Sequence, residues 1–203
     1  YASVIRSPVS GGSVVLFDEA AALAIDGVVD VIKIPESTIG NAFGGTYSGE
    51  TVAVVADSYW TANLAIKELD VQWSKTGFES VSSDSIFAQF DRDITSRIER
   101  QTDRVEGEAD SVFSTAAKII DADYHVPYLA HTCMEPLNAT ANVRDGNAEV
   151  WVGCQNPLGF RRDVAVVLGL EEEAVTLHNH AMGGGFGRKA RPDYAIQAAQ
   201  ISQ

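Results

Sequence analysis

Three consecutive glycines at positions 183–185 restrict how the C-terminal third of this chain can fold more than any other feature does. Each glycine costs about 1 kcal/mol inside a regular helix or strand, so residues 182–189 are predicted to form a loop. This loop joins a predicted strand, 175–180, to a predicted helix, 192–202. Glycine runs are used mainly where the backbone must come close to another group. Backbone N–H groups in such a turn, followed by a helix N-terminus, suit a phosphate or another oxyanion; a strand-to-helix loop without a ligand is the alternative.

Phe186 is the one large side chain in this loop, and it is predicted either to form the wall of a pocket or to pack in the core. The loop matches neither the dinucleotide-binding fingerprint, in which G-x-G-x-x-G follows the first strand, nor the G-x-x-x-x-G-K-[ST] of a P-loop. The sequence also has no G-x-S-x-G nucleophile motif, so serine-hydrolase chemistry has no support.

The chain of 203 residues has 28 acidic and 15 basic side chains and a formal net charge of −13. This charge disfavours nucleic acid as a partner, because binding to a phosphate backbone depends on basic side chains. Residues 141–203 are nearly neutral, however, so a phosphate group on a small ligand remains compatible with them. The bases close in sequence to the glycine loop are Arg161, Arg162, Arg188, Lys189 and Arg191.

No run of about 18 apolar residues is present, so direct membrane insertion is not expected. The sequence has no secretory leader, but it begins at Tyr1 and stops inside a predicted helix, so we expect a piece of a longer chain. Cys133 and Cys154 are the only cysteines, which excludes a disulfide framework or a four-thiolate metal site within this sequence. A single bridge between them is the alternative, but we expect two reduced thiols, because a hairpin turn at 145–146 would leave them out of register.

Residues 1–76 alternate between strand and helix patterns and are predicted to form a small α/β unit. The apolar run 51–56 is typical of a strand that is covered on both faces, and Asp57-Ser58 is predicted to cap the helix that follows. The stretch 34–49 is predicted to be a long loop. The predicted strands are 2–7, 28–34, 51–56 and 70–73, and the predicted helices are 17–24 and 59–69. The expected buried side of the second helix consists of Trp60, Leu64, Ile66 and Leu69, together with the small Ala62 and Ala65.

Residues 77–108 are rich in charge and serine and are predicted to be a connecting helical segment between two domains. Ile86, Phe90, Ile94 and Ile98 recur at every fourth position, which gives the helix one apolar stripe. We expect this stripe to pack on neighbouring parts of the same chain. A surface that docks a partner is the alternative.

Residues 109–203 begin with alternating patterns that are typical of strands, at 118–128 and 137–143. Asp145-Gly146 then predicts a hairpin turn onto a strand at 149–153, since both residues accept positive φ angles. Pro157 marks the first turn of a helix that is predicted to end before Gly169. A strand at 175–180 leads into the glycine loop.

Several polar side chains near these elements are candidates for chemistry. Gln155 follows a predicted strand at the end where α/β folds place their sites, so its amide is a candidate donor to an oxo group; a surface glutamine is the alternative. His131 and Glu135 have the spacing of a zinc pair on a helix, but the proline that follows disfavours a helix there. His178 and His180 share one face of a strand without a third ligand. Both pairs are therefore predicted to be structural.

Three motifs occur in order: His131-x-x-Met134-Glu135-Pro136, Trp151-x-x-x-Gln155-Asn-Pro157 and Met182-Gly-Gly-Gly-Phe-Gly-Arg-Lys189. Together they resemble the molybdenum hydroxylases of the xanthine dehydrogenase and aldehyde oxidase family. The upstream segments 1–8 and 52–60 look like the α/β-hammerhead domain that precedes the cofactor domain in that family. The resemblance implies an α+β fold with a hammerhead domain at 1–76, the connecting segment at 77–108 and the first part of a molybdopterin-binding domain at 109–203.

The resemblance also implies a cofactor, molybdopterin in its cytosine dinucleotide form, whose sulfurs hold molybdenum without a metal ligand from the protein. Gln155 would hydrogen-bond an oxo ligand, backbone amides of the glycine loop would hold the cofactor, and Phe186 would lie beside the metal. The implied cofactor-binding residues are Gln155, Gly184, Gly185, Phe186, Gly187 and Arg188. The implied reaction hydroxylates an aromatic N-heterocycle or oxidises an aldehyde with water as oxygen source, and its electrons pass to iron–sulfur clusters in a partner subunit.

Two departures from the family pattern refine this expectation. Ala190 stands where the xanthine-oxidising branch has an acidic substrate-binding residue, so purines are not the expected substrates. The Gly-Arg-Lys form looks more like the large subunits of isoquinoline 1-oxidoreductases and related membrane-linked aldehyde dehydrogenases. The catalytic glutamate of the family lies beyond the matching region, so we expect no catalytic residue here and no activity from the chain alone.

Two other classes of function stay open at this point. One is a phosphate- or nucleotide-binding module without redox chemistry, and the other is a structural piece that docks a partner through the helix predicted at 85–100. The sequence also leaves the compartment open between bacterial cytoplasm and periplasm.

Overall fold

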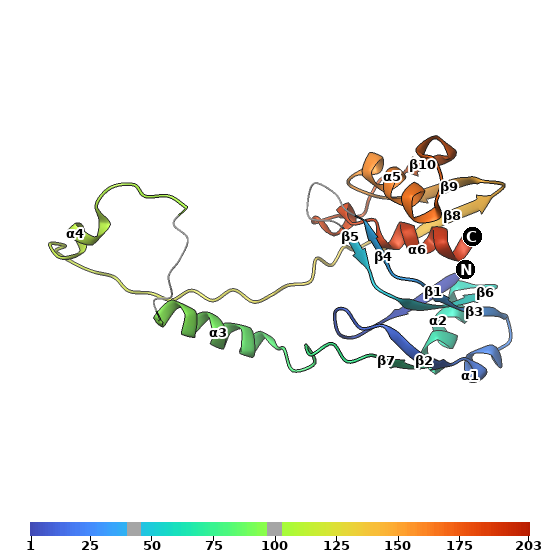
Figure 1. The fold of residues 1–203 in the computed structure, drawn as a ribbon, viewed down its shortest axis with the longest axis horizontal. Coiled ribbons are helices and arrows are strands. Elements are labelled where there is room, and N and C mark those ends of the chain that lie inside the picture. Colours follow the sequence, from blue (N-terminus) through green and yellow to red (C-terminus); the bar gives the residue numbers. More distant parts are fainter. Residues whose placement is uncertain (40–45, 97–102) are drawn as a thin grey trace. The chain divides into compact units, whose positions relative to one another are not determined.

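The computed structural model describes residues 1–39, 46–96 and 103–203. It divides into two compact units, of which the first joins Tyr1–Glu79 to His131–Gln203 and the second is Ser80–Ala130 (Figure 1). We call 1–79 the N-terminal segment, 80–130 the middle segment and 131–203 the C-terminal segment. Helices and strands are mixed in the first unit, as predicted. The domain boundaries expected after residues 76 and 108 stay predictions.

The N-terminal segment is built around strand β6 (Thr51–Ala56), which pairs antiparallel with β1 (Ala2–Arg6) on one side and β3 (Val28–Ile34) on the other. The apolar run of β6 is covered on both faces, as predicted, because the side chains at positions 52–54 have no exposed surface. Ser58 caps the following helix α2 (Tyr59–Ala65) by accepting the N–H of Thr61 at 3.0 Å. A one-turn helix, η1 (Ile66–Glu68), continues α2.

A second antiparallel pair, β2 (Val14–Asp18) and β7 (Asp70–Trp73), lies with the short helix α1 (Ala20–Leu23) in the same segment. The helix predicted at 17–24 is therefore shorter than expected, because Phe17 pairs with Val71 in the strand ladder. The core of this segment consists of Val14, Ala22, Val31, Val52, Val54, Ala65, Ile66 and Leu69.

Two further predictions for this segment were wrong. The stretch 34–49 is not entirely loop, since β4 (Ser37–Ile39) and β5 (Thr46–Ser48) pair antiparallel across residues 40–45, which lie outside the described structure. Trp60 and Leu64 are 70% and 39% exposed, whereas Ile66 and Leu69 are buried as expected. Ala62 and Ala65 are also buried as expected, and their small side chains let the helix lie close to the sheet.

The C-terminal segment has its own three-stranded sheet. Strand β9 (Asn147–Val152) lies between the antiparallel β8 (Ala139–Arg144) and the parallel β10 (Val175–Asn179). The predicted Asp-Gly hairpin connects β8 to β9, and Asp145 and Gly146 have φ angles of 52° and 73°. Two successive positive φ angles are what this tight turn requires.

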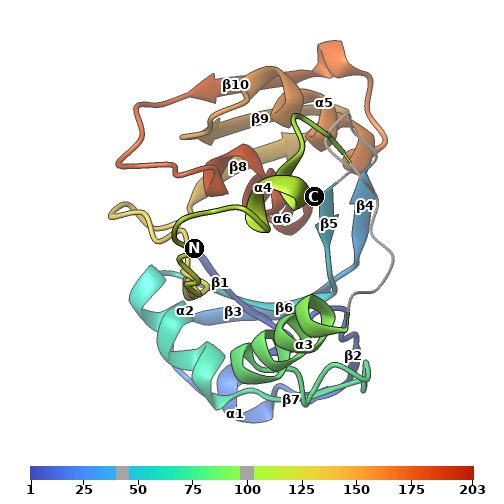
Figure 2. The same ribbon diagram turned by 90° about the vertical axis from the view of Figure 1, so that its left-hand side faces the viewer.

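Helix α5 (Pro157–Leu168) makes the crossover between the two parallel strands, followed by the short turn η2 (Glu172–Ala174). Its ends agree with the prediction: Asn156 caps the first turn, and Gly169 closes the last with a φ of 68°. Helix α6 (Asp193–Ser202) packs against α5 and β8 (Figure 2). The largest fully buried side chain in this core, Phe160, makes an edge contact with Tyr194, with the ring centroids 5.7 Å apart.

Helix α6 also joins the C-terminal segment to the N-terminal segment within the first unit. Gln197 donates to Ser48 Oγ at 3.2 Å and accepts from Arg6 at 2.6 Å. A groove of about 940 Å³ runs beside this contact, between β1, α2, β8 and α6.

The middle segment contains α3 (Ser83–Thr95), which begins with a Ser82/Ser85 capping box, and the short helix α4 (Ala109–Phe113). The helix predicted from the fourfold spacing is present, but none of its residues is buried; Phe90 and Ile94 are exposed, and Ile98 lies outside the described residues. The expectation that its apolar stripe packs away from solvent is therefore not met.

The strand predicted at 118–128 is absent, because this part of the described chain has no neighbouring strand with which to pair. Phe87 contacts the rings of His125 and Tyr128 instead, with centroid distances of 5.5 and 5.8 Å. Across the described ranges, no helix is both long and apolar enough to cross a membrane.

Candidate functional site

The glycine loop, residues 182–189, joins β10 to α6 through a one-turn helix, η3 (Arg188–Ala190). Gly184 and Gly187 have φ angles of 99° and 80°, which glycine adopts without a steric penalty. Phe186 between them has a φ of 48° and is one of two non-glycine residues with positive φ in the described structure. A bulky residue in this region is strained, and such strain is concentrated at functional sites.

The glycine run lies close to other groups, as predicted, and the groups that the structure shows there belong to the protein itself. A Cβ atom at Gly183 would lie 2.6 Å from Glu135 Cβ, and one at Gly185 would lie 2.6 Å from Gln155 Oε1. Gly184 faces Cys133, whose Sγ also donates to the Gly185 carbonyl at 3.4 Å. No side chain other than hydrogen fits at positions 183 and 185 without displacing these neighbours.

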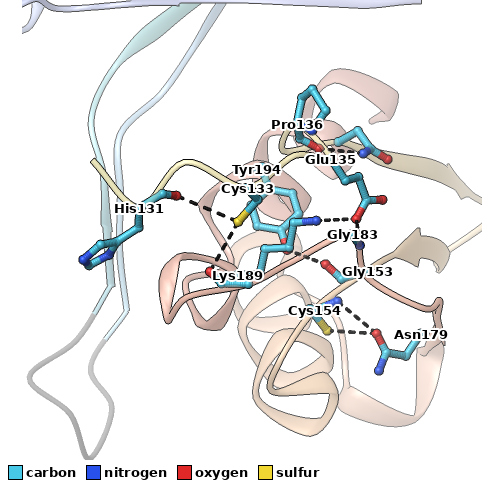
Figure 3. Close-up of polar contacts among 12 residues, drawn as sticks. His131, Cys133, Glu135, Pro136, Gly153, Cys154, Asn179, Gly183, Lys189 and Tyr194 are labelled. Carbon is cyan, nitrogen blue, oxygen red and sulfur yellow. Dashed lines mark hydrogen bonds and ion pairs between the residues drawn. The ribbon is translucent and has the colours of Figure 1, made fainter. Parts of the chain in front are cut away.

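Glu135 and Lys189 form an ion pair at one side of the loop (Figure 3). Lys189 is 1% exposed, and its ammonium group donates to Glu135 Oε2. The same oxygen accepts the Gly183 N–H at 2.8 Å, while the Glu135 N–H donates to the Gly183 carbonyl at 3.2 Å. The Lys189 hydrogen bond, followed by the one from Gly183, lowers the pKa of Glu135. This carboxylate is therefore ionised at neutral pH.

The structural reading of the His131–Glu135 pair agrees with these contacts. Glu135 binds Lys189 and the loop backbone rather than sharing a helical face with His131. His178 likewise lies 3.0 Å from Glu149 Oε1 and stacks on Trp151 at 5.1 Å. Within the described residues, no group of three or more His, Cys, Asp or Glu side chains could hold a metal ion.

Gln155 lies between β9 and α5, at the carboxyl end of the strand as predicted. Its backbone N–H donates to the Lys189 carbonyl at 3.0 Å, and its side-chain Oε1 accepts the Gly187 N–H at 3.0 Å. These contacts fix the amide plane against the loop, although the residue is exposed. Because Oε1 faces the protein, the Nε2 group is the part of the side chain that can donate to a ligand.

Arg188 contacts α6 rather than the open side of the loop. Its two terminal nitrogens donate to the two Asp193 oxygens at 2.8 and 2.7 Å, and Arg6 adds a bond of 2.9 Å to the same carboxylate. The hydrogen bonds that Arg188 donates to Asp193 raise the pKa of Arg188. Bidentate pairs of this kind are geometrically specific, so Arg188 links the loop to the first turn of α6 and to β1.

Other bases near the loop in sequence also have partners inside the protein. Arg161 donates to the carbonyls of Glu172 and Val175, and Arg162 donates to Asp163 at 2.7 Å. The positive charge predicted around the loop is thus largely offset by neighbouring groups.

Helix α6 and the second cysteine complete the surroundings of the loop. The Tyr194 hydroxyl donates to the Gly153 carbonyl at 2.8 Å, and burial raises the pKa of this phenol. Cys154 donates to Asn179 Oδ1 at 3.5 Å, and burial raises the pKa of its thiol as well. Cys133 and Cys154 are both free thiols, as predicted.

The open side of the loop presents unpaired hydrogen-bond donors. Within the described structure, the backbone N–H groups of Gly184, Gly185 and Phe186 have no partner, and neither has the Gln155 Nε2 group. The Phe186 ring is 69% exposed, so the alternative that it packs in the core was wrong. Neighbouring N–H groups beside an exposed ring suit an oxygen-rich, anionic ligand.

The comparison with known families decides between the classes of function considered above. Residues 90–202 match the family model described as the molybdopterin cofactor-binding domain. The chain belongs to this family. Its membership of the molybdenum hydroxylases, predicted from three short motifs, is thereby confirmed. The glycine loop, with its unpaired N–H groups, lies within the residues that match this family model.

The molybdopterin-binding chain is similar to the isoquinoline 1-oxidoreductase subunit beta of Brevundimonas diminuta, with 28% identity over 99% of the chain and 25% of that protein. A membrane-bound aldehyde dehydrogenase [pyrroloquinoline-quinone] of Gluconacetobacter polyoxogenes is 31% identical over 75% of the chain and 20% of that protein. The chain thus spans a quarter or less of the length of these relatives. The crystal structure of quinoline 2-oxidoreductase from Pseudomonas putida has the same fold over the whole chain and 30% of its own length, with a TM-score of 0.64 at 20% identity.

Proposed function

We propose that this chain is the part of a molybdenum hydroxylase in which an α/β-hammerhead domain leads into the first part of the molybdopterin-binding domain. The observation that carries the proposal is the set of unpaired donors on the glycine loop: the N–H groups of Gly184, Gly185 and Phe186, beside Gln155 Nε2. A molybdopterin–molybdenum unit offers oxo and phosphate oxygens as acceptors for such donors. The cofactor supplies the two-electron redox chemistry when it is bound.

Some residues at the loop would contact the cofactor or the substrate, and others would hold the loop in place. Gln155 Nε2 would donate to an oxygen of the cofactor, because Oε1 is occupied by the Gly187 N–H. The exposed Phe186 ring would form the wall of the substrate pocket and exclude water from it. Arg188 would act through Asp193, holding the end of the loop against α6.

For the whole protein we propose oxidation of an aromatic N-heterocycle or an aldehyde, with water as the oxygen source. The names of the two relatives above support these substrate classes. Ala190, in place of an acidic residue, supports the exclusion of purines. We also propose molybdopterin in its cytosine dinucleotide form, and iron–sulfur clusters in a partner subunit as electron acceptor. The base that deprotonates the nucleophile would come from outside this chain.

Metal analysis of the full-length protein that contains this chain tests the proposal directly. We expect about one molybdenum per chain, and dye reduction that depends on an N-heterocycle or an aldehyde but not on a purine. A full-length protein that contains nucleotide and no molybdenum would support the module without redox chemistry instead.

A variant pair locates the site within the protein. Gln155→Ala removes the proposed side-chain donor and is expected to reduce molybdenum retention, whereas Gln89→Ala, on the exposed face of α3, is not. Equal retention by the two variants would argue against the glycine loop as the cofactor site.

A further inference from the structure

We propose that Lys189 and Glu135 are positioning residues of the molybdopterin site, and that their ion pair holds the glycine loop and Gln155 in the one arrangement that leaves the loop donors open. This inference rests on the proposed function, in which neither Lys189 nor Glu135 contacts the cofactor. It starts from three observed features: the burial of Lys189, its bonds to two other segments, and the ion pair itself.

Lys189 is the residue where three parts of the chain meet. Its ammonium group binds Glu135, in the segment that precedes β8. Its carbonyl accepts the backbone N–H of Gln155 at 3.0 Å, and its own N–H lies 3.4 Å from the Gly185 carbonyl. A displacement of Lys189 would therefore move the end of β9 and the glycine loop together.

The contacts anchor the loop on both sides of its open donors. On the first side, Gly183 exchanges two hydrogen bonds with Glu135, of 2.8 Å to the carboxylate and 3.2 Å from its backbone N–H. On the other side, Gly187 donates to Gln155 Oε1 at 3.0 Å. The three N–H groups without partners belong to the residues between these anchors. Lys189 connects the two anchors, since it binds Glu135 through its side chain and Gln155 through its backbone.

Charge makes this connection specific. An ammonium group that is 1% exposed is unfavourable unless it is paired, and among the described residues Glu135 is its one acidic partner. Neutralising Glu135 would leave Lys189 buried and unpaired, and would also weaken the bond to Gly183. Arg188, the preceding residue, binds Asp193 instead, so the two adjacent cations fix opposite sides of the same turn.

A second Lys–Glu pair in the first unit provides a control that is matched in residue types but not in burial, because the Lys33 side chain is 41% exposed. Lys33 Nζ lies 2.9 Å from Glu50 Oε1, and Glu50 also accepts a backbone N–H, from Val14 at 2.7 Å. As with Glu135, the pKa of Glu50 is lowered mainly by the hydrogen bond from its lysine. In both pairs, the glutamate carboxylate binds a lysine and also accepts a backbone N–H. The Lys33–Glu50 pair, however, links β3 to β2 and contacts no residue of the glycine loop.

The experiment compares both pairs in the full-length protein. The variants are Lys189→Met, Glu135→Gln and the double variant, each matched by Lys33→Met, Glu50→Gln and their double variant. Three quantities are measured: molybdenum and pterin per chain after dialysis, the electron paramagnetic resonance signal of partly reduced enzyme, and the midpoint of thermal unfolding without cofactor. Glu135→Gln, which alters a partly exposed side chain, serves if Lys189→Met does not fold.

We expect the glycine-loop variants to retain cofactor roughly 10- to 100-fold less tightly, the range seen when supports of metal ligands are removed. The remaining bound molybdenum should give a shifted resonance signal. The double variant Glu135→Gln/Lys189→Met is expected to regain thermal stability relative to Glu135→Gln, because no buried charge is left unpaired, without regaining cofactor retention. The control variants should lose stability only.

Two outcomes would overturn the inference. One is wild-type cofactor retention and an unchanged resonance signal in both loop single variants; the other is the same loss of cofactor in the control pair. Either result would leave the proposed function intact, provided that the wild-type protein contains molybdenum. A wild-type protein without molybdenum would contradict the proposed function itself.

Discussion

The C-terminal and middle segments both contain amphipathic helices, and α3 of the middle segment has the clearest apolar stripe, but their side chains are buried to different extents. In the C-terminal segment, α5 and α6 bury five and six residues respectively, among them Phe160 with no exposed surface. In the middle segment, the longer α3 buries none, although its Ser82/Ser85 capping box forms as the sequence dictates. Local pattern is thus enough to start a helix, whereas burial depends on a second element that has a matching apolar surface.

The largest expected difference in stability comes from removing one aromatic ring from each segment. Phe160→Ala should lower the free energy of unfolding by about 3–5 kcal/mol, because the ring is fully buried against Tyr194. Phe87→Ala removes ring contacts with His125 and Tyr128 in the middle segment and should cost about 1 kcal/mol or less. Urea denaturation followed by tryptophan fluorescence measures the first loss, and hydrogen exchange in α3 measures the second, because the middle segment contains no tryptophan. Similar losses in the two variants would mean that the middle segment is as well packed as the C-terminal one.

Steric crowding in the glycine loop should have the next largest effect. Gly183→Ala places a Cβ atom 2.6 Å from Glu135 Cβ, so either the loop or the 131–136 segment must move, at a cost of about 1–3 kcal/mol. Gly187→Ala meets no atom within 4 Å but has a φ of 80°, and should cost about 1 kcal/mol through backbone strain alone. Unfolding midpoints distinguish the two causes. A milder effect at position 183 than at 187 would contradict the close packing of the loop against Glu135.

Much of the C-terminal fold could be predicted because its signals are local. The Asp145-Gly146 turn, the Asn156 cap and the Gly169 terminator each depend on the backbone preferences of one or two residues. The strands β3, β6 and β7 and the loop of three glycines were predictable for the same reason. Family membership followed from motifs of a few residues each, and a family model that matches residues 90–202 confirms it.

What could not be predicted depends on partners that are distant in sequence. Lys189 and Glu135 are 54 positions apart, and neither composition nor periodicity indicates that a lysine beside the loop is buried. The alternation at 118–128 resembles that of β8, but in the described structure only β8 has a strand beside it.

The N-terminal caps of α2 and α3 test, with a smaller expected effect, whether a packed helix and an exposed helix contribute differently to stability. Ser58 caps α2, which packs on the first sheet, and Ser82 caps the exposed α3; each accepts a backbone N–H, at 3.0 and 3.2 Å. Ser58→Ala should cost about 1 kcal/mol in global unfolding. Ser82→Ala should leave global unfolding unchanged and instead speed local hydrogen exchange in α3, because little else depends on that helix. Equal losses of global stability would show that α3 unfolds together with the rest of the molecule.

The smallest expected effect is a change in the acid sensitivity of unfolding. The pKa of Glu135 is lowered from an ordinary value of 4.5 in the folded state, first by the Lys189 hydrogen bond and then by the Gly183 N–H. Its contribution to stability is therefore fully present above the unfolded pKa and is lost as the pH falls through the lower folded pKa. Glu135→Gln should make the fall in stability between about pH 5 and 3 less steep than in the wild type.

Glu106→Gln is the matching change in the middle segment. Its ion pair with Arg104 is 2.7 Å long, but both side chains are about three-quarters exposed, and pairs of this kind contribute little to stability. The free energy of unfolding of this variant at pH 7, measured by chemical denaturation, should equal that of the wild type. If Glu106→Gln and Glu135→Gln lower it equally, the burial of Lys189 adds nothing to the Glu135–Lys189 pair, because an exposed pair would then contribute the same stability.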